Sequence, residues 1–197
     1  MPTFPYTTRF HHIVVGFHGP VPTMIDRAQS TLRFRRALRR YLDLLTQSLV
    51  VRQLQPWHEN LAKRQVKSPK VCVRDSGLLH ALLGIRSERE LLTHPKSGAS
   101  WEGNVLEEIL KTTEPDGAYF RATHQGAELD LLLMRKGRRV GIEVKRADAP
   151  TLTPSMRIAL ADLKLDELNV IHPGTRPYEL APRVKVMPVS EVPGLGA

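Results

Sequence analysis

A predicted hairpin around Lys136-Gly137 holds the side chains of this chain that are best suited to chemistry. Two runs of alternating apolar residues flank this pair, which is typical of a tight turn between antiparallel strands. With these two residues as the loop, Asp130 faces Glu143, and Glu128 faces Lys145. Like charges that face each other destabilise a sheet. The pattern therefore predicts three carboxylates gathered around one lysine, an arrangement that a divalent cation would relieve.

The opposite face of the same hairpin is apolar, so we expect one buried face and one face that carries the charges. The apolar positions are Leu129, Leu131, Leu133, Val140, Ile142 and Val144. A plainer alternative is a surface hairpin whose charged residues form solvated ion pairs, each worth about 0–1 kcal/mol.

Composition indicates a soluble globular protein in a reducing setting. The chain has 197 residues, of which 41% are hydrophobic and 25% charged. Cys72 is its only cysteine, which excludes an internal disulfide and a cysteine-rich zinc site. No apolar run approaches the roughly 18 residues of a membrane span, and the first residues lack a secretory hydrophobic region. We therefore expect a cytoplasmic protein with no membrane partner.

The net charge of +9 is concentrated in the first half of the chain. Residues 1–98 carry +10, and residues 99–197 carry −1. A basic half beside a carboxylate cluster favours a nucleic-acid partner, although solubility alone would also account for the charge. Residues 1–30 are predicted to be irregular. Residues 31–50 are predicted to form a basic amphipathic helix, with Leu38, Tyr41 or Leu42, Leu45 and Leu49 on one face and Arg33, Arg36, Arg39 and Arg40 largely on others.

The remaining pattern predicts a mixed α/β sheet flanked by helices. The order is helix, three strands, helix and strand, with Val184–Val189 as a last strand. Thr153 and Pro154 form an N-cap and first-turn pair for the helix between strands. Asp75-Ser76 is predicted to cap a helix over Gly77–Leu83, and Ser87 a short helix over residues 88–92. A helix that crosses between two strands places them parallel.

Several strings, in this order and spacing, resemble a domain-of-unknown-function family found C-terminal to AAA-type ATPase modules in bacteria and archaea. Through that family the chain resembles the PD-(D/E)xK nuclease superfamily. The resemblance covers about residues 36–190. The strings are Arg40-Tyr-Leu-Asp-Leu-Leu, Pro56-Trp57, Lys67-Ser-Pro-Lys, Arg74-Asp-Ser-Gly-Leu-Leu-His80, His94-Pro, Gly98-Ala-Ser-Trp-Glu102, Gly126-Ala-Glu-Leu-Asp130 and Ile142-Glu-Val-Lys145.

The resemblance implies a restriction-endonuclease-like fold and a role for each matching residue. Asp130 and Glu143 match metal-ligand carboxylates, and the backbone carbonyl of Val144 would be a further ligand for Mg²⁺ or Mn²⁺. Lys145 matches the lysine that positions the attacking water and stabilises the charged phosphate.

Two further acidic residues join the catalytic set by resemblance. Glu102 matches a helix carboxylate that helps hold the metal or water, and Glu128 is characteristic of the narrower family. Glu102 lies in the first turn of a helix predicted from Trp101 to about Lys111, with Ser100 as its N-cap. Without the resemblance, Glu102 reads as a carboxylate that complements the helix dipole.

The chain departs from the family pattern at two points. Leu129 stands where the superfamily motif has proline, and no G-x-x-x-x-G-K-[ST] phosphate-binding loop occurs. We therefore expect no ATP binding and interpret the chain as a truncated member, a split gene or a fragment. By the resemblance, residues 31–92 would be a winged-helix-like remnant and linker, and residues 93–192 the nuclease-like domain.

The sequence thus favours a metal-dependent nuclease acting on DNA. The alternative is a catalytically silent DNA-binding or protein-docking domain that partners a separate AAA-type ATPase.

Overall fold

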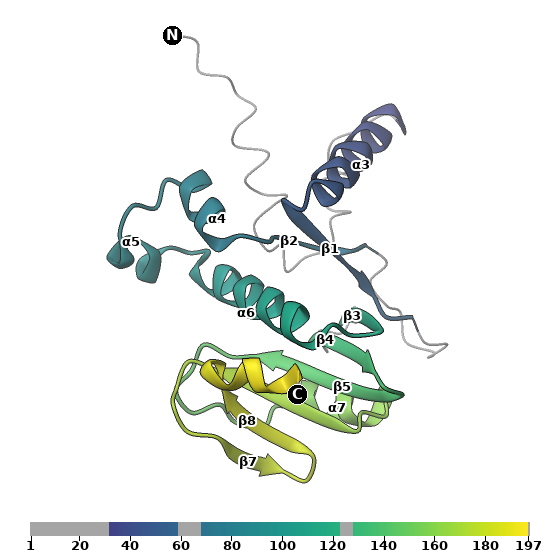
Figure 1. Ribbon diagram of the computed structural model, residues 1–197, viewed down its shortest axis with the longest axis vertical. Helices are drawn as coiled ribbons and strands as arrows, with labels where there is room; N and C mark the ends of the chain where they lie inside the picture. The colour runs from purple at the N-terminus through teal and green to yellow at the C-terminus, as the bar shows by residue number, and fades with distance from the viewer. Residues whose placement is uncertain (1–31, 59–67, 123–127, 197) are drawn as a thin grey trace. The chain divides into compact units, whose positions relative to one another are not determined.

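The computed structural model describes residues 32–58, 68–122 and 128–196, and these form a mixed α/β fold (Figure 1). The predicted class, a mixed sheet with flanking helices, is confirmed. The eight-stranded sheet has the order β2 (Lys70–Val73), β1 (Val51–Pro56), β3 (Gly117–Ala122), β4 (Glu128–Arg135), β5 (Arg138–Val144), β6 (Glu167–His172), β8 (Val184–Pro188) and β7 (Tyr178–Ala181). The helices are α3 (Leu32–Gln47), α4 (Ser76–Leu82), α5 (Glu88–Thr93), α6 (Ser97–Thr113), α7 (Pro154–Asp162) and the 3₁₀-helix η1 (Val189–Gly196). Within the described ranges, none of the helices has the length and apolar character to cross a membrane.

The chain divides into two compact units. The first comprises residues 1–53 and 68–104, and the second residues 54–67 and 105–197. The domain boundaries predicted at residues 30 and 92 stay predictions. The carboxylates and the lysine of the predicted hairpin all belong to the second unit.

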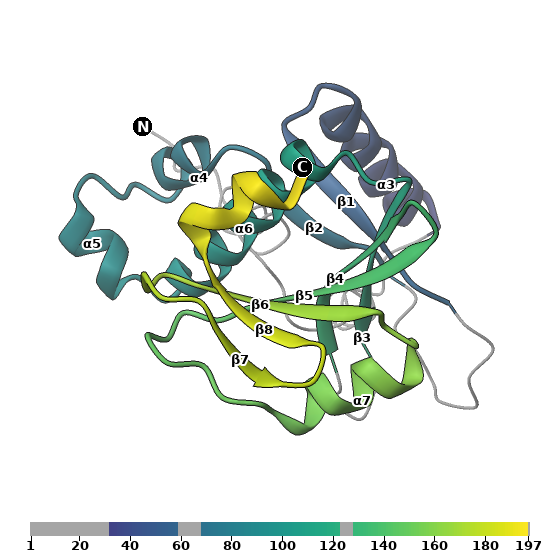
Figure 2. The same ribbon diagram turned by 60° about the horizontal axis from the view of Figure 1, so that its bottom comes forward.

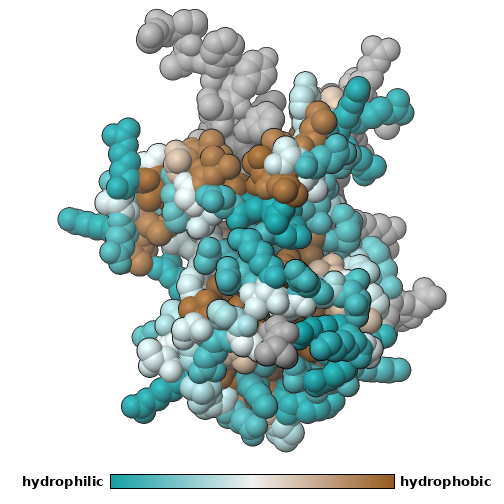
Figure 3. Space-filling model, viewed as in Figure 1, coloured by the Kyte–Doolittle hydropathy of each residue, from teal (hydrophilic) through white to brown (hydrophobic). Residues whose placement is uncertain are grey.

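In the first unit, α3 buries only one of its faces. Leu42 and Leu45 pack against a small cluster formed by Val51, Val71, Val73 and Leu79. Tyr41 and Leu44 are 62% and 54% exposed, and Figure 3 shows apolar surface over α3 and α4. The prediction that Leu49 continues the apolar stripe is wrong, because the helix ends at Gln47 and Leu49 has a φ of 61°.

Local capping signals locate most helix starts correctly. The side chain of Asp75 accepts a hydrogen bond from the Leu78 N–H at 2.6 Å, and Ser87 and Thr153 cap α5 and α7 in the same way. The predicted N-cap at Ser100 is wrong. α6 begins at Ser97, and the Ser100 hydroxyl lies 2.7 Å from Nε2 of His80, so it is engaged by a tertiary contact.

In the second unit, β4 and β5 form the predicted hairpin. Paired positions run from Arg135–Arg138 to Leu131–Ile142, in the predicted register. Lys136 and Gly137 have φ values of 48° and 76°, the two positive values that a two-residue turn of this twist requires. The ladder between β4 and β5 ends at the pair of Leu131 with Ile142. The predicted pairings of Asp130 with Glu143 and of Glu128 with Lys145 are therefore not part of it.

The ladder between β3 and β4 shifts register at Asp130. Tyr119 pairs with Leu132 and Arg121 with Leu129, so two residues of β4, Asp130 and Leu131, lie opposite the single residue between Tyr119 and Arg121. An extra residue of this kind breaks the alternation of side chains and re-aims one of them. In agreement, Leu129 and Leu132 belong to the same core cluster, although strict alternation would separate them.

The prediction that only one face of the hairpin is apolar is wrong. Leu132 is fully buried in the cluster that α7 covers, together with Met156, Ala159, Leu163, Leu168 and Val170. α7 packs on β4, β5 and β6 (Figure 2), and as predicted the strands on either side of it, β5 and β6, are parallel. The carboxylates on β4 and β5 therefore lie at the end of a strand pair that is buried on both faces.

We predict that Gly141→Ala destabilises the protein by about 1–3 kcal/mol, as overpacked cores generally do. A Cβ on Gly141 would lie 2.6 Å from Cδ1 of Leu165 and 2.9 Å from Cδ1 of Leu168, and both leucines are buried. The measurement is the urea midpoint followed by circular dichroism. The control is Gly98→Ala on α6, where an added Cβ meets nothing within 4 Å. Equal midpoints for the two variants would contradict the packing argument.

Candidate functional site

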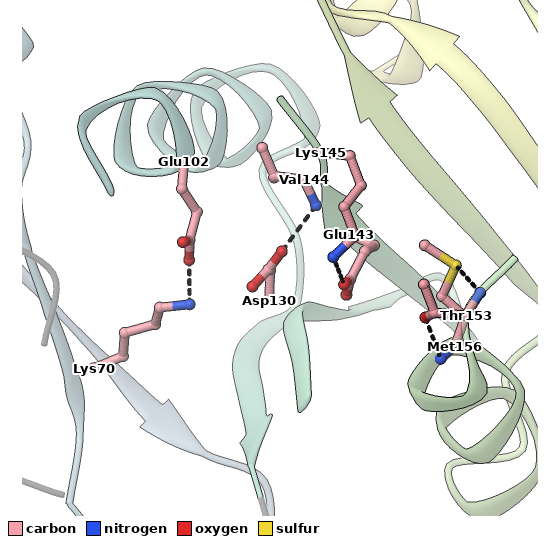
Figure 4. A network of polar contacts seen from close by, with 8 residues as sticks. All are labelled: Lys70, Glu102, Asp130, Glu143, Val144, Lys145, Thr153 and Met156. Atoms are coloured by element: carbon pink, nitrogen blue, oxygen red, sulfur yellow. Dashed lines mark hydrogen bonds and ion pairs between the residues drawn. The ribbon is translucent and has the colours of Figure 1, made fainter. Parts of the chain in front are cut away.

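Asp130 is held at the register shift by the backbone of the neighbouring strand. Its side chain is buried, and Oδ2 accepts a hydrogen bond from the N–H of Val144 at 2.8 Å (Figure 4). A carboxylate that accepts a hydrogen bond from a backbone N–H is fixed in place. The contact ties β4 to the carboxyl end of β5, where Glu143 and Lys145 lie.

Glu143 is a buried carboxylate with one engaged and one unsatisfied oxygen. Its Oε1 lies 2.6 Å from the ammonium nitrogen of Lys145 (Figure 4). Its Oε2 is buried and has no hydrogen-bond partner among the described residues. A buried polar atom without a partner is uncommon in native proteins and calls for an explanation, such as an ion that completes the site.

The surroundings of Glu143 raise the pKa of its carboxyl group from 4.5 to about 7. Burial is the largest cause, followed by the negative charge of Asp130. Lys145 offsets part of this shift through its hydrogen bond and charge, and Glu128 adds to it. The two hairpin carboxylates therefore repel each other, as the sequence predicts, although their strands are not paired at these residues.

Lys145 joins the carboxylate pair to the protein surface. Its side chain is 36% exposed, whereas that of Glu143 is 7% exposed. Its backbone N–H donates to the carbonyl of Ile171 on β6 at 2.8 Å. The lysine thus stands at the carboxyl end of parallel strands, the edge of an α/β sheet at which ligands usually bind.

A metal ion beside Asp130 and Glu143 would have few protein ligands. The described part of the chain contains no group of three or more His, Cys, Asp or Glu side chains arranged to hold a metal ion. Glu128, at the start of β4, acts on Glu143 through its charge. Asp130 and Glu143 would therefore be the side-chain ligands, and the role of the Val144 carbonyl stays a prediction.

Glu102 has a local partner that the sequence did not reveal. It lies on α6 in the first unit and forms an ion pair with Lys70 on β2, and each of these side chains is 12% exposed (Figure 4). Lys70 is the last residue of the quoted string Lys67-Ser-Pro-Lys, but nothing in that string predicts the pair. The catalytic role of Glu102 stays a prediction.

The arginines proposed to bind nucleic acid lie on α3 in the first unit. Arg36, Arg39 and Arg40 are exposed, as the amphipathic pattern predicts. The side chain of Arg33 lies outside the described residues.

His172 is a second residue that sequence reasoning missed. It follows Ile171, whose carbonyl accepts the backbone N–H of Lys145, at the end of β6, and it is 2% exposed. Its Nε2 donates to the carbonyl of Arg176 at 3.3 Å, and its Nδ1 has no hydrogen-bond partner in the described part of the chain. Only the parallel pairing of β5 with β6 brings Ile171 and Lys145 together, and that pairing is not visible in the local sequence.

Comparison with known proteins finds relatives of both parts of the chain. Residues 97–192 match the family Domain of unknown function (DUF4143), and residues 28–89 match the family Domain of unknown function (DUF8612). An uncharacterized protein of Mycobacterium tuberculosis, Rv2008c, is 44% identical over 180 residues, which cover 91% of this chain and 41% of that protein. An uncharacterized protein of Mycobacterium bovis, Mb2031c, gives the same values. The chain thus spans about two fifths of the length of these curated relatives. No solved structure matches the chain.

We predict that Glu143→Gln stabilises the metal-free protein above pH 7 by up to about 3 kcal/mol, the equivalent of the pKa shift. A raised carboxyl pKa means that the folded state binds the proton more tightly than the unfolded state. The wild-type stability from this group is therefore fully present below pH 4.5 and is lost as the pH rises to about 7.

The measurement is urea denaturation of wild type and variant across this range with a chelator present. The exposed Glu179→Gln variant on β7 serves as the control. A difference between Glu143→Gln and wild type that does not change with pH would contradict the prediction.

Proposed function

We propose that the second unit is a metal-dependent nuclease domain that hydrolyses phosphodiester bonds of nucleic acid, with DNA as the favoured substrate. One observation carries the proposal: a buried carboxylate, Glu143, has an unsatisfied oxygen beside a second carboxylate and a lysine. The resemblance to the PD-(D/E)xK superfamily supports it, because Asp130, Glu143 and Lys145 match its motif.

The residues fit a divalent cation by the chemistry of their donor atoms. Mg²⁺ and Mn²⁺ prefer carboxylate and carbonyl oxygens. Glu143 has a buried oxygen without a hydrogen bond, and the charge of Asp130 disfavours the negative form of Glu143. A cation held by both carboxylates would remove this repulsion and satisfy the oxygen.

Asp130 and Glu143 would hold the metal, and Lys145 would stabilise negative charge on the phosphate. A bound divalent cation would supply Lewis acidity and lower the pKa of a water molecule. Asp130, fixed by the Val144 N–H, and Glu143 would orient the cation from two adjacent strands. Lys145 reaches the surface, so its ammonium can contact a phosphate oxygen as negative charge develops there.

A second candidate is a catalytically silent nucleic-acid-binding or docking module. The ion pair between Lys145 and Glu143 favours it, because the pair neutralises one carboxylate without a metal. The fold alone cannot decide between the two. Under either reading, a separate AAA-type ATPase is a proposed partner.

We predict Mg²⁺-dependent cleavage of plasmid DNA by the wild-type chain and its loss in Asp130→Asn and Lys145→Ala. Asn keeps an acceptor for the Val144 N–H, whereas Lys145→Ala leaves the buried Glu143 carboxylate without its ammonium partner. Thermal melting therefore accompanies the assay and verifies that both variants are folded. Glu179→Gln is the control because Glu179 is exposed on β7. Metal-independent cleavage, or cleavage that survives Asp130→Asn, would place the chemistry elsewhere. Intact DNA binding without any cleavage would favour the silent module.

We predict that replacing Arg36, Arg39 and Arg40 with Gln weakens binding to duplex DNA at low salt. Each lost phosphate contact should reduce the slope of log affinity against log salt by about 0.9. The measurement is fluorescence anisotropy over a range of salt concentrations. Arg86→Gln with Arg89→Gln, exposed in the same unit, gives a control for charge loss per residue. An unchanged slope in the α3 variant would show that these arginines do not bind nucleic acid.

A further inference from the structure

The Glu143 carboxylate is paired with the ammonium group of Lys145. The Lys145 ammonium lies 2.6 Å from Oε1 of Glu143, while Oε2 has no hydrogen-bond partner among the described residues. The side chain of Glu143 is 7% exposed, whereas that of Lys145 is 36% exposed. Of the two, Lys145 has the longer side chain and the access to solvent that a change of partner requires.

A metal and this ammonium would repel each other if both were bound to Glu143. A divalent ion would bind a carboxylate oxygen at about 2.0–2.6 Å. The ammonium is already at hydrogen-bond distance from the same carboxylate, so the two cations would be near neighbours in a site screened from water. A metal bound to Oε2 would therefore weaken the contact between Lys145 and Oε1 of Glu143.

We propose that Lys145 and the divalent cation exchange on Glu143, and that this exchange couples metal binding to nucleic-acid binding. The proposal rests on the proposed function. Without nucleic acid, the displaced ammonium loses its contact with Glu143, so metal binding is weakened. With nucleic acid bound, a phosphate oxygen receives the ammonium, and the competitor for Glu143 is removed.

Linkage makes the coupling reciprocal. If nucleic acid tightens metal binding by some factor, the metal tightens nucleic-acid binding by the same factor. Lys145 thus acts as an internal counter-ion that offsets part of the charge of the carboxylates, and its ammonium is transferred to the phosphate when substrate and metal are both present.

The experiment is calorimetric titration of Mn²⁺ into the chelator-treated full chain, alone and with a phosphorothioate DNA duplex that resists cleavage. Lys145→Met removes the charge and keeps the length of the side chain. We expect this variant to bind Mn²⁺ at least about 5-fold more tightly than wild type without DNA, within the usual range of coupling between sites. The duplex should tighten Mn²⁺ binding to the wild type but not to Lys145→Met.

Two variants control for charge and for folding. Lys145→Arg keeps the competing cation, so its Mn²⁺ affinity should stay closer to that of wild type than to that of Lys145→Met. Lys136→Met removes one charge at the hairpin turn, the opposite end of β5, and should bind Mn²⁺ as the wild type does. Thermal melting of each variant verifies that it is folded.

The outcomes separate this inference from the proposed function. Equal Mn²⁺ affinity of wild type and Lys145→Met would overturn the exchange and leave the metal site standing. Tighter binding by Lys145→Met without an effect of DNA on the wild type would overturn the coupling. If no variant binds Mn²⁺, the proposed function fails together with the inference.

Discussion

The burial of Glu143 at the carboxyl end of β5 is the constraint on which the rest of the site depends. A carboxylate that is 5% exposed cannot rely on water for its charge, so neighbouring groups must compensate it. Lys145 does this for one oxygen, and the other has no hydrogen-bond partner in the described ranges. The proximity of Asp130 adds repulsion, which helps raise the pKa of Glu143 to about 7. An additional cation would lower the free energy of this arrangement.

The sheet around Glu143 creates that burial. β5 lies between β4 and β6, and α7 covers the cluster to which Leu132, Met156 and Leu168 belong. The register shift in β4 then places Asp130 where its carboxylate accepts the Val144 N–H. Register shifts of this kind occur often beside active sites, because they re-aim a side chain where the ladder is locally disrupted. The backbone of β4 thus orients a proposed ligand.

The proposed nuclease function and the proposed exchange involve the same charged groups, Asp130, Glu143 and Lys145, with and without a bound metal. In the metal-free protein the Lys145 ammonium offsets part of the negative charge of the cluster. In the proposed loaded state the lysine charge serves the phosphate. The chemistry of these side chains supports the proposed function.

Local features of this protein could be predicted from its sequence alone. The helix caps at Asp75, Ser87 and Thr153 and the Lys136-Gly137 turn depend on neighbouring residues, and the hairpin register follows from the turn and the period of two. Tertiary structure decided the rest. The shift at Asp130 depends on pairing with β3, the second buried face depends on α7, and the contacts of Lys70 with Glu102 and of Lys145 with β6 join residues distant in sequence. No local pattern encodes these, because packing between separate elements determines which polar groups are buried and which charges must compensate them.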